Sequence, residues 1–335
     1  MDRLIKLAQI GCGYWGPNLL RNFTALLECK VSHLVETSEE RKEFVRKQHP
    51  SVNTSLTFEQ ILDEESIDGL VIATPAGLHF EQTKQALLAN KHVLVEKPMA
   101  KNVREVDELI RIASDRKLVL MSGHTFIYNS AVEFIKESIR KGDLGDVRYL
   151  YSQRLNLGRI RSDVDALWNF APHDISIIQY LLEDQKPEKV SSQGMSFIQE
   201  GIDDVVFLNI RYPNSLANVH VSWLDPLKVR KIVIVGSEKM IVYDDVADDK
   251  ISIYDKGVDK FSKLGESMDF DIPQPFSFKY RSGDILVPHI EYVEPLRQEA
   301  EEFISCIREG KEAKTGAKHT REVIKILDMA SKSKA

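Results

Sequence analysis

The chain has 335 residues, which is enough for two domains that each bury a hydrophobic core. Hydrophobic residues make up 43% of it and charged residues 29%, ordinary values for a globular protein, and no run approaches the roughly 20 apolar residues of a membrane span. The net charge of -6 gives no reason to expect a polyanionic partner, so the composition argues against nucleic acid, and the hydropathy against a membrane, as partners.

The three cysteines indicate neither a disulfide framework nor a metal site. Cys12, Cys29 and Cys306 are far apart and odd in number, and no CxxC or Cys/His ligand spacing occurs. The N-terminal segment MDRLIKLAQI contains too short an apolar run for a signal peptide. We therefore expect a cytoplasmic protein without a metal ion.

The first 122 residues alternate between strands and helices. Continuous apolar runs that fit buried strands are separated by amphipathic segments with helical spacing. This alternation indicates a parallel sheet that is covered by helices on both faces. Strands are predicted at 4–10, 31–36, 69–74, 92–96 and 118–123, and helices at 15–27, 39–48, 56–63, 79–90 and 102–116.

The pattern changes near residue 123. After a helix at 130–141 and a GDLG turn, strand-like runs follow one another at hairpin spacing, which indicates a mostly antiparallel sheet with a helix after Pro172 packed on it. The stretch 257–290 shows no clear periodicity and is expected to be an extended excursion. Examples of these strand-like runs are 147–157, 205–212, 217–224 and 230–236, and two closing helices are predicted at about 295–308 and 318–332.

These patterns predict an α/β protein with two domains. The N-terminal domain, residues 1–122, is a Rossmann domain with a doubly wound parallel sheet. The C-terminal domain, residues 123–335, is an α+β domain with a large, open, mostly antiparallel sheet.

A glycine loop follows the first predicted strand and opens the first predicted helix. The segment GCGYWG (11–16) fits the GxGxxG pattern in the context that dinucleotide binding requires. Gly11 permits the tight turn, Gly13 lets the backbone approach a pyrophosphate, and Gly16 allows close contact between helix and strand. Tyr14 and Trp15 lie between these glycines. We predict that all five residues bind the cofactor.

Glu36 ends the second predicted strand, where an acidic residue binds the adenosine ribose hydroxyls. A carboxylate there accepts hydrogen bonds from both hydroxyls but repels a 2′-phosphate. Ser38 and Arg41 are near enough in sequence to soften this repulsion. We therefore expect NAD as the cofactor and consider NADP a weaker alternative.

The segment ALWNFAPHDI (166–175) allows two interpretations. Pro172, His173 and Asp174 have the features of a first helical turn, because proline has no N–H to lose there and an acidic residue suits the helix dipole. Alternatively, Asn169 and His173 face a reacting substrate. The local pattern favours the first interpretation and leaves the second open.

A further motif gives the chain a family resemblance. The segment HVLVEKPMA (92–100) carries Glu-Lys-Pro at a strand end, after the glycine loop and after ATPAGLHFEQTKQAL (73–87). With these motifs the whole chain resembles the glucose–fructose oxidoreductase / inositol dehydrogenase / MocA family. The resemblance implies a Rossmann domain for NAD and a second domain for substrate binding and oligomerisation. It also implies pyranose-type substrates that are oxidised or reduced by a nicotinamide.

The resemblance also assigns roles to single residues. It implies that Lys97 is the catalytic lysine and that Thr74, Pro75, His79 and Glu96 line the cofactor together with it. Independently of the family, Lys97 ends a predicted strand, and open α/β sheets bind ligands at the carboxyl ends of their strands.

The family's substrate-domain motif is Asp, three residues, His. This chain has Asn169 and His173 at that spacing, so the resemblance implies that His173 is the family's catalytic histidine. Asn169 departs from the pattern, because an amide can hydrogen-bond a hydroxyl but cannot accept its proton. General-base work then falls to His173 and Lys97. We predict His173 as the principal base and Lys97 as the group that stabilises the developing oxyanion, and the reverse assignment stays open.

Basic residues near the catalytic segment indicate an anionic substrate. The resemblance extends to nucleotide-sugar 3-dehydrogenases that act on UDP-N-acetylglucosamine or its uronate in polysaccharide biosynthesis. Oxidation of a free sugar or inositol, and reduction of a 3-keto sugar, remain alternatives. A non-catalytic NAD sensor, favoured by Asn169, and a structural protein with a vestigial fold are rivals from other classes. The predicted substrate residues are Arg159, Arg161, Trp168, Lys228 and Arg230.

One face of the predicted open sheet has no helices to cover it. Members of the family that the chain resembles commonly bury this face between subunits. We therefore expect a homodimer or a homotetramer.

Overall fold

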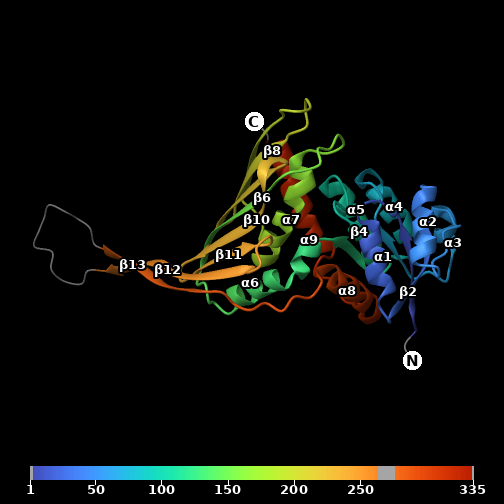
Figure 1. Ribbon diagram of the computed structural model, residues 1–335, viewed down its shortest axis with the longest axis horizontal. Coiled ribbons are helices and arrows are strands. Elements are labelled where there is room, and N and C mark those ends of the chain that lie inside the picture. Colours follow the sequence, from blue (N-terminus) through green and yellow to red (C-terminus); the bar gives the residue numbers. More distant parts are fainter. Residues whose placement is uncertain (1–2, 263–275, 334–335) are drawn as a thin grey trace, which may run out of the picture.

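The computed structural model describes residues 3–262 and 276–333. It contains two sheets, one on each side of the middle of the molecule, and helices flank both (Figure 1). The predicted α/β architecture, with a Rossmann domain followed by a domain built on a large open sheet, is confirmed.

The first sheet has five parallel strands in the order β2-β1-β3-β4-β5. Its core strands are continuous apolar runs, and all four residues of β3 are buried. The chain order reverses between β1 and β3, and at such a switch point the loops after neighbouring strands separate and leave a crevice. The strands are β1 (Ile5–Ile10), β2 (Cys29–Val35), β3 (Gly69–Ile72), β4 (His92–Glu96) and β5 (Leu120–Gly123).

The helices of this domain form where the apolar spacing predicts them. In several of them a side chain caps the first turn. The side-chain oxygen of Asn102, for example, accepts a hydrogen bond from the N–H of Glu105 at 3.0 Å. The helices are α1 (Gly16–Thr24), α2 (Glu39–Gln48), α3 (Phe58–Asp63), η1 (Ala76–Leu78), α4 (His79–Leu88) and α5 (Val103–Asp115).

The second sheet has eight strands in the order β13-β12-β11-β10-β6-β9-β8-β7. Its pairs are antiparallel except for β6 and β9. Helices α7 (Ala166–Leu181) and α9 (Ala317–Lys332) pack on one of its faces. The strands are β6 (Val147–Leu157), β7 (Lys189–Met195), β8 (Val205–Arg211), β9 (Leu216–Ser222), β10 (Leu224–Gly236), β11 (Met240–Asp244), β12 (Ile251–Ser262) and β13 (Phe276–Leu286).

The stretch 257–290 contains the end of β12 and all of β13, and residues 263–275 within it lie outside the described residues. The two strands pair and extend together away from the rest of the molecule (Figure 1). Both faces of this arm meet solvent, because Tyr280 on one face and Lys279 on the other are both exposed. The sequence shows no alternation there because no face is consistently buried.

The helix that carries His173 begins earlier than predicted. Helix α7 spans Ala166–Leu181, and the Asp165 carboxylate caps it by accepting from the N–H of Trp168 at 3.0 Å. The prediction that Pro172 occupies the first turn is therefore wrong, because Pro172 lies inside the helix. A proline there supplies no N–H to the carbonyl of Trp168, which interrupts the helical hydrogen bonds beside Asn169.

The closing helices return to the first domain. Helix α8 contacts α1 and η2, and α9 contacts both α5 and α7. The domain boundary at residues 122 and 123 stays a prediction. No helix in the described ranges, 3–262 and 276–333, is long and apolar enough to cross a membrane. The remaining helices are η2 (Thr125–Tyr128), α6 (Ser130–Arg140), α8 (Pro295–Glu309) and α9 (Ala317–Lys332).

Candidate active site

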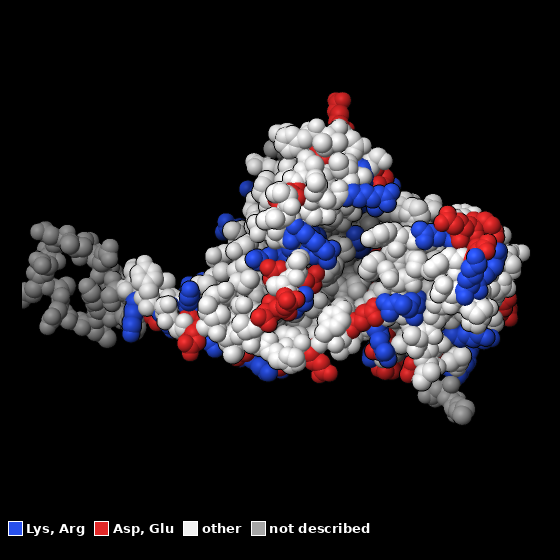
Figure 2. All heavy atoms as spheres, viewed as in Figure 1, with Lys and Arg blue, Asp and Glu red and all other residues white. Residues whose placement is uncertain are grey.

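A cleft of about 1540 Å³ lies between the two sheets, at the carboxyl ends of the first sheet's strands. Figure 2 shows the hollow, with lysine and arginine side chains close to it. Residues of both domains line it, and every site residue predicted from the sequence is among them except Gly16. The cleft therefore brings together segments that are far apart in the chain.

The glycine loop forms one end of the cleft. Gly11 has a φ of +92°, and a Cβ there would lie 2.7 Å from the carbonyl oxygen of Ala73. A Cβ on Gly16 would lie 2.8 Å from the carbonyl oxygen of Gly11, whereas one on Gly13 would meet nothing within 4 Å. The Gln9 amide donates to the carbonyls of Gly11 and Gly16, both at 2.9 Å. The hydrogen bonds from Gln9 therefore hold the loop in place, and the space next to Gly13 is free. Tyr14 and Trp15 are exposed and line the cleft.

Glu36 holds the glycine loop to the end of β2. Its carboxylate accepts hydrogen bonds from the N–H groups of Cys12 at 2.7 Å, Thr37 at 2.7 Å and Ser38 at 3.0 Å. Partial burial alone would raise the pKa of Glu36, but the backbone hydrogen bonds from Ser38, Cys12 and Thr37 outweigh it and lower the pKa. Glu36 is therefore an ionised acceptor at neutral pH.

The neighbours of Glu36 differ in part from the sequence-based expectation. The Ser38 hydroxyl caps helix α2 by accepting from the N–H of Arg41 at 3.4 Å. The basic side chain that lines the cleft near Glu36 is that of Lys42, not Arg41. A 2′-phosphate at this end of the cleft would meet the Glu36 carboxylate and Lys42.

The loops after β3 and β4 are joined by a buried histidine. The two ring nitrogens of His79 contact the carbonyl oxygens of Pro98 and Thr74, each at 2.8 Å. The Thr74 hydroxyl donates to Gln82 at 2.5 Å, and the Lys97–Pro98 peptide bond is cis. His79 therefore fixes the backbone on both sides of the predicted cofactor position, while Thr74 and Pro75 form the cleft wall.

Glu96 and Lys97 lie where the two domains meet. The N–H of Lys97 donates to the Glu96 carboxylate at 3.2 Å, and a Cβ on Gly123 would lie 3.0 Å from that carboxyl carbon. Burial raises the pKa of Glu96. Burial also lowers the pKa of Lys97, and the positive charges of Arg154 and Arg161 lower it further. The negative charge of Glu96 acts in the opposite direction. The lysine is therefore easier to deprotonate than a free lysine.

The catalytic candidates of the second domain lie one turn apart on α7. The Lys97 ammonium donates to the main-chain carbonyl oxygen of Asn169 at 3.1 Å, next to the interruption that Pro172 makes. The His173 ring packs edge-on against Phe126, with ring centroids 5.0 Å apart. Burial, followed by the charge of Lys97, lowers the pKa of His173 well below its usual value. His173 is therefore a neutral imidazole at neutral pH.

The predicted substrate residues all line the cleft, but their side chains differ in whether they already have a partner in the protein. Arg161 pairs with Asp163 at 2.5 Å, and Arg230 pairs with Asp245 at 3.3 Å. Arg159 and Lys228 are exposed and form no ion pair with another residue of the described ranges. The Trp168 indole N–H donates to the Ser331 hydroxyl at 2.9 Å, which fixes this ring against α9.

Arg154 and Phe126 are among the residues of the cleft that sequence reasoning missed. The Arg154 Nε lies 2.7 Å from the Asp174 carboxylate in a buried ion pair, and its guanidinium lies over the Phe126 ring, 4.5 Å from the centroid. A signal exists for Arg154, because Leu150, Ser152 and Arg154 share the inward register of β6. A charged residue in a buried register requires a partner.

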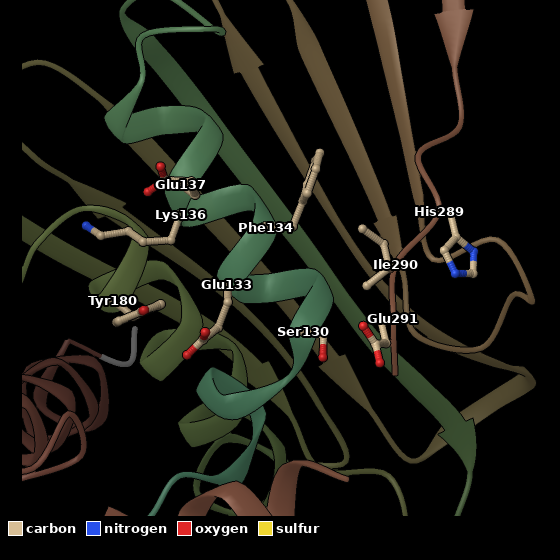
Figure 3. Close-up of a pocket in the computed structure, with 9 residues that line it drawn as sticks. All are labelled: Ser130, Glu133, Phe134, Lys136, Glu137, Tyr180, His289, Ile290 and Glu291. Carbon is tan, nitrogen blue, oxygen red and sulfur yellow. The ribbon is translucent and has the colours of Figure 1, made fainter. Parts of the chain in front are cut away.

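A second, shallower hollow of about 540 Å³ lies between α6 and residues 289–291 (Figure 3). Three of its charged side chains are already paired: Glu133 with Lys314, Lys136 with Glu183 at 3.0 Å, and Glu137 with Arg140 at 2.7 Å. It is far more open than the cleft and holds none of the predicted site residues. Within the described ranges, no group of three or more His, Cys, Asp or Glu side chains is placed to hold a metal ion.

The parallel sheet, the glycine loop and the acidic residue at the end of β2 define a protein of the dinucleotide-binding class, with a second domain that closes the cleft. Residues 5–124 match the oxidoreductase family with an NAD-binding Rossmann fold, and residues 132–242 match the GFO/IDH/MocA C-terminal domain. The chain belongs to the GFO/IDH/MocA oxidoreductase family. The resemblance carried by the Glu-Lys-Pro motif is thereby confirmed.

Relatives within the family have different substrates. The UDP-N-acetylglucosamine 3-dehydrogenase of Acidithiobacillus ferrooxidans is 26% identical over 259 residues, 76% of this chain and 78% of that protein. The scyllo-inositol 2-dehydrogenase (NADP(+)) of Bacillus subtilis is 29% identical over 169 residues, 49% of this chain and 44% of that protein. An uncharacterised oxidoreductase of Streptococcus pneumoniae is 24% identical over 225 residues, 63% of this chain and 60% of that protein.

The chain matches about 60% of the length of the first curated relatives. Among solved structures, that of the UDP-N-acetylglucosamine 3-dehydrogenase of Acidithiobacillus ferrooxidans superimposes with a TM-score of 0.80 at 22% identity, covering 99% of this chain and 98% of the other. This likeness shows that the two proteins share a fold.

Proposed function

We propose that the protein is an NAD-dependent oxidoreductase that oxidises a secondary hydroxyl, at C3, of a nucleotide sugar such as UDP-N-acetylglucosamine or its uronate. The observation that carries this proposal is the contact of Lys97 with the Asn169 carbonyl, one helical turn from His173. This contact brings Lys97 of the first domain close to the helix that carries His173 in the second domain. Both residues line the cleft that begins at the glycine loop. Oxidation with NAD fits the family of the chain, whose N-terminal domain is that of an oxidoreductase with an NAD-binding Rossmann fold.

The residues at the glycine-loop end fit a dinucleotide. The open backbone at Gly13 leaves room for a pyrophosphate, and the ionised Glu36 can accept from ribose hydroxyls. Thr74, Pro75, His79 and Glu96 form the wall between this end and Lys97. A nicotinamide held by these residues would supply the acceptor for the hydride of the substrate carbon.

The protein's own side chains accept the proton and stabilise the developing negative charge. His173 is neutral, so it can accept the hydroxyl proton, and Lys97 stabilises the negative charge that develops on the oxygen. Asn169 can hydrogen-bond the sugar but cannot take its proton. Burial lowers the pKa of Lys97 as well, so the reverse assignment, with Lys97 as the base, also fits the cleft.

The substrate class rests on charge. Arg159 and Lys228 present positive charges to the cleft that no described acidic side chain neutralises by an ion pair, and a diphosphate would do so. The relative that acts on UDP-N-acetylglucosamine agrees with this choice. The inositol dehydrogenase relative favours a second candidate, a free polyol or sugar. Asn169 in place of the family's aspartate favours a non-catalytic sensor of NAD.

An absorbance assay separates these candidates. The purified protein is incubated with NAD or NADP and with UDP-sugars, free sugars or inositol, and the formation of reduced nicotinamide is followed. We expect turnover with NAD and a UDP-sugar. Turnover only with free sugars or inositol would contradict the nucleotide-sugar assignment, and NAD binding without turnover on any of them would favour the sensor. Reduction of 3-keto sugars is tested in the same assay by running it with NADH.

Replacing Glu36 by alanine tests the cofactor assignment. We expect a narrower preference for NAD over NADP, because the variant loses both an acceptor for the ribose hydroxyls and the repulsion of a 2′-phosphate. We also expect weaker binding of both cofactors, because Cys12, Thr37 and Ser38 lose the acceptor of their N–H groups. Fluorescence titrations measure both affinities, with the exposed Glu40→Ala as control. Tighter binding of NADP than of NAD by the native protein would contradict the assignment.

The open face of the large sheet carries exposed apolar residues, among them Tyr149 and Phe207. Water-exposed apolar surface of this kind is commonly buried between subunits. We therefore expect a homodimer or homotetramer in solution. Light scattering at micromolar concentration measures the molar mass, and the mass of a single chain would contradict this expectation.

A further inference from the structure

Several buried polar atoms lie behind the cleft without a partner among the described residues. They include Nδ1 of His173, both ring nitrogens of His124, and both amide atoms of Gln179. His124 is 2% exposed and Gln179 is fully buried. Buried polar groups that the protein leaves unpaired are usually satisfied by ordered water. The structure therefore contains the donors and acceptors of an internal water site next to the catalytic helix.

His124 is held rigidly at this place. It follows β5 directly, and its ring packs edge-on against His319, with centroids 5.7 Å apart. His319 is itself fixed, because its nitrogens contact the Asp184 carboxylate at 2.9 Å and the Ser176 hydroxyl at 2.8 Å. Ser176 lies three residues after His173 on α7. The His124 ring thus packs against a histidine that is itself hydrogen-bonded, while its own two nitrogens have no partner among the described residues.

His124 also lies within electrostatic reach of both catalytic candidates. The positive charge of Lys97 acts on His124, and His124 acts on His173. Phe126, two residues after His124, packs against the His173 ring. Within this segment, Phe126 therefore gives His173 an apolar contact, and His124 supplies two ring nitrogens that have no partner among the described residues.

The partner of Nδ1 decides what His173 can do. A neutral imidazole carries one proton, and the hydrogen bond made by one nitrogen determines whether the other is free to accept. Nδ1 is sealed from solvent, so Nε2 is the nitrogen open to the cleft. For Nε2 to accept a proton, the Nδ1–H form must be favoured, and this requires an acceptor at Nδ1.

We propose that His124 is a positioning residue that holds an ordered water against Nδ1 of His173 and so keeps Nε2 as the proton-accepting nitrogen. The water accepts from Nδ1–H of His173 and donates to a ring nitrogen of His124. This inference rests on the proposed function, because it gives His173 the role of the base. It adds a residue outside the Glu-Lys-Pro and Asn169–His173 motifs to the catalytic apparatus.

Two variants of His124 test the proposal. His124→Phe fills a similar volume but cannot bind water, whereas His124→Gln keeps a polar group that can. His124→Phe should lower kcat by roughly 10–100-fold, the usual effect of losing a partner that orients a functional histidine, with little change in the KM for NAD. His124→Gln should restore most of kcat. His49→Phe is the matched control, since His49 is a partly buried histidine at the end of α2 that does not line the cleft.

Nitrogen NMR of histidine-labelled protein reads the tautomer directly. We expect the Nδ1–H form of His173 in the native protein and in His124→Gln, and a mixture of tautomers in His124→Phe. The proposal is overturned if native His173 carries its proton on Nε2, or if His124→Phe leaves both kcat and the tautomer unchanged. The native spectrum decides the question even if His124→Phe does not fold. If the native protein shows the Nδ1–H form but turns over no substrate, the proposed function fails and the water site stands.

Discussion

Replacing Lys97 by alanine is expected to lower kcat by roughly 10²–10⁴, at least as much as any other single change in the cleft. The developing oxyanion would lose its nearest positive charge, and the domains would lose the contact between Lys97 and the Asn169 carbonyl. The Glu96 carboxyl would also lose its cation, so its already raised pKa should rise further. Both kcat and kcat/KM are measured on one substrate, and NAD binding is titrated separately.

The matched control is Lys101→Ala, four residues further along, where the side chain is exposed and does not line the cleft. It should leave kcat unchanged. A thermal unfolding curve for each variant separates loss of fold from loss of catalysis. Near-native turnover by a folded Lys97→Ala protein would remove Lys97 from the mechanism.

His173→Ala and Asn169→Ala should fail in different ways. Losing the base at His173 should lower kcat by roughly 10²–10⁴. Asn169→Ala should mainly weaken substrate binding, by about 1–3 kcal/mol for a lost buried hydrogen bond. Lys97 contacts the main-chain carbonyl of Asn169, and this contact survives the side-chain truncation. The effect of Asn169→Ala therefore reports on the amide alone, and KM measured beside kcat distinguishes the two variants.

Asn169→Asp restores the family's carboxylate beside Lys97. A negative charge there favours the protonated lysine and raises its pKa, so the variant should be tolerated, and the loss of activity on the basic side of the pH–rate profile should shift to higher pH. If His173→Ala kept near-native turnover while NAD still bound, His173 would be only a structural residue of α7. The proposed mechanism would then be wrong.

The sequence by itself determined the features that depend on short stretches of chain. Gly11, Gly13 and Gly16 are spaced for one turn between a strand and a helix, and Glu36 ends the next strand, so local pattern and sheet topology suffice to find them. The alternation of apolar runs and amphipathic segments over residues 1–122 likewise predicted each strand and each α-helix of the first domain, but not the short helix η1. Lys97 was found through the family resemblance of the Glu-Lys-Pro motif, and its position after a parallel strand supported the assignment.

Only the tertiary structure decided where α7 begins and what surrounds His173. Pro172 carries the local signal of a helix start, yet Asp165 caps the helix seven residues earlier, and the contacts of α7 with β9 and α9 keep the proline inside it. The Arg154–Asp174 pair joins a strand to a helix, and His319 reaches His124 from the last helix of the chain. Such contacts depend on how distant segments pack, and a linear pattern records only which faces are buried, not which partner covers them.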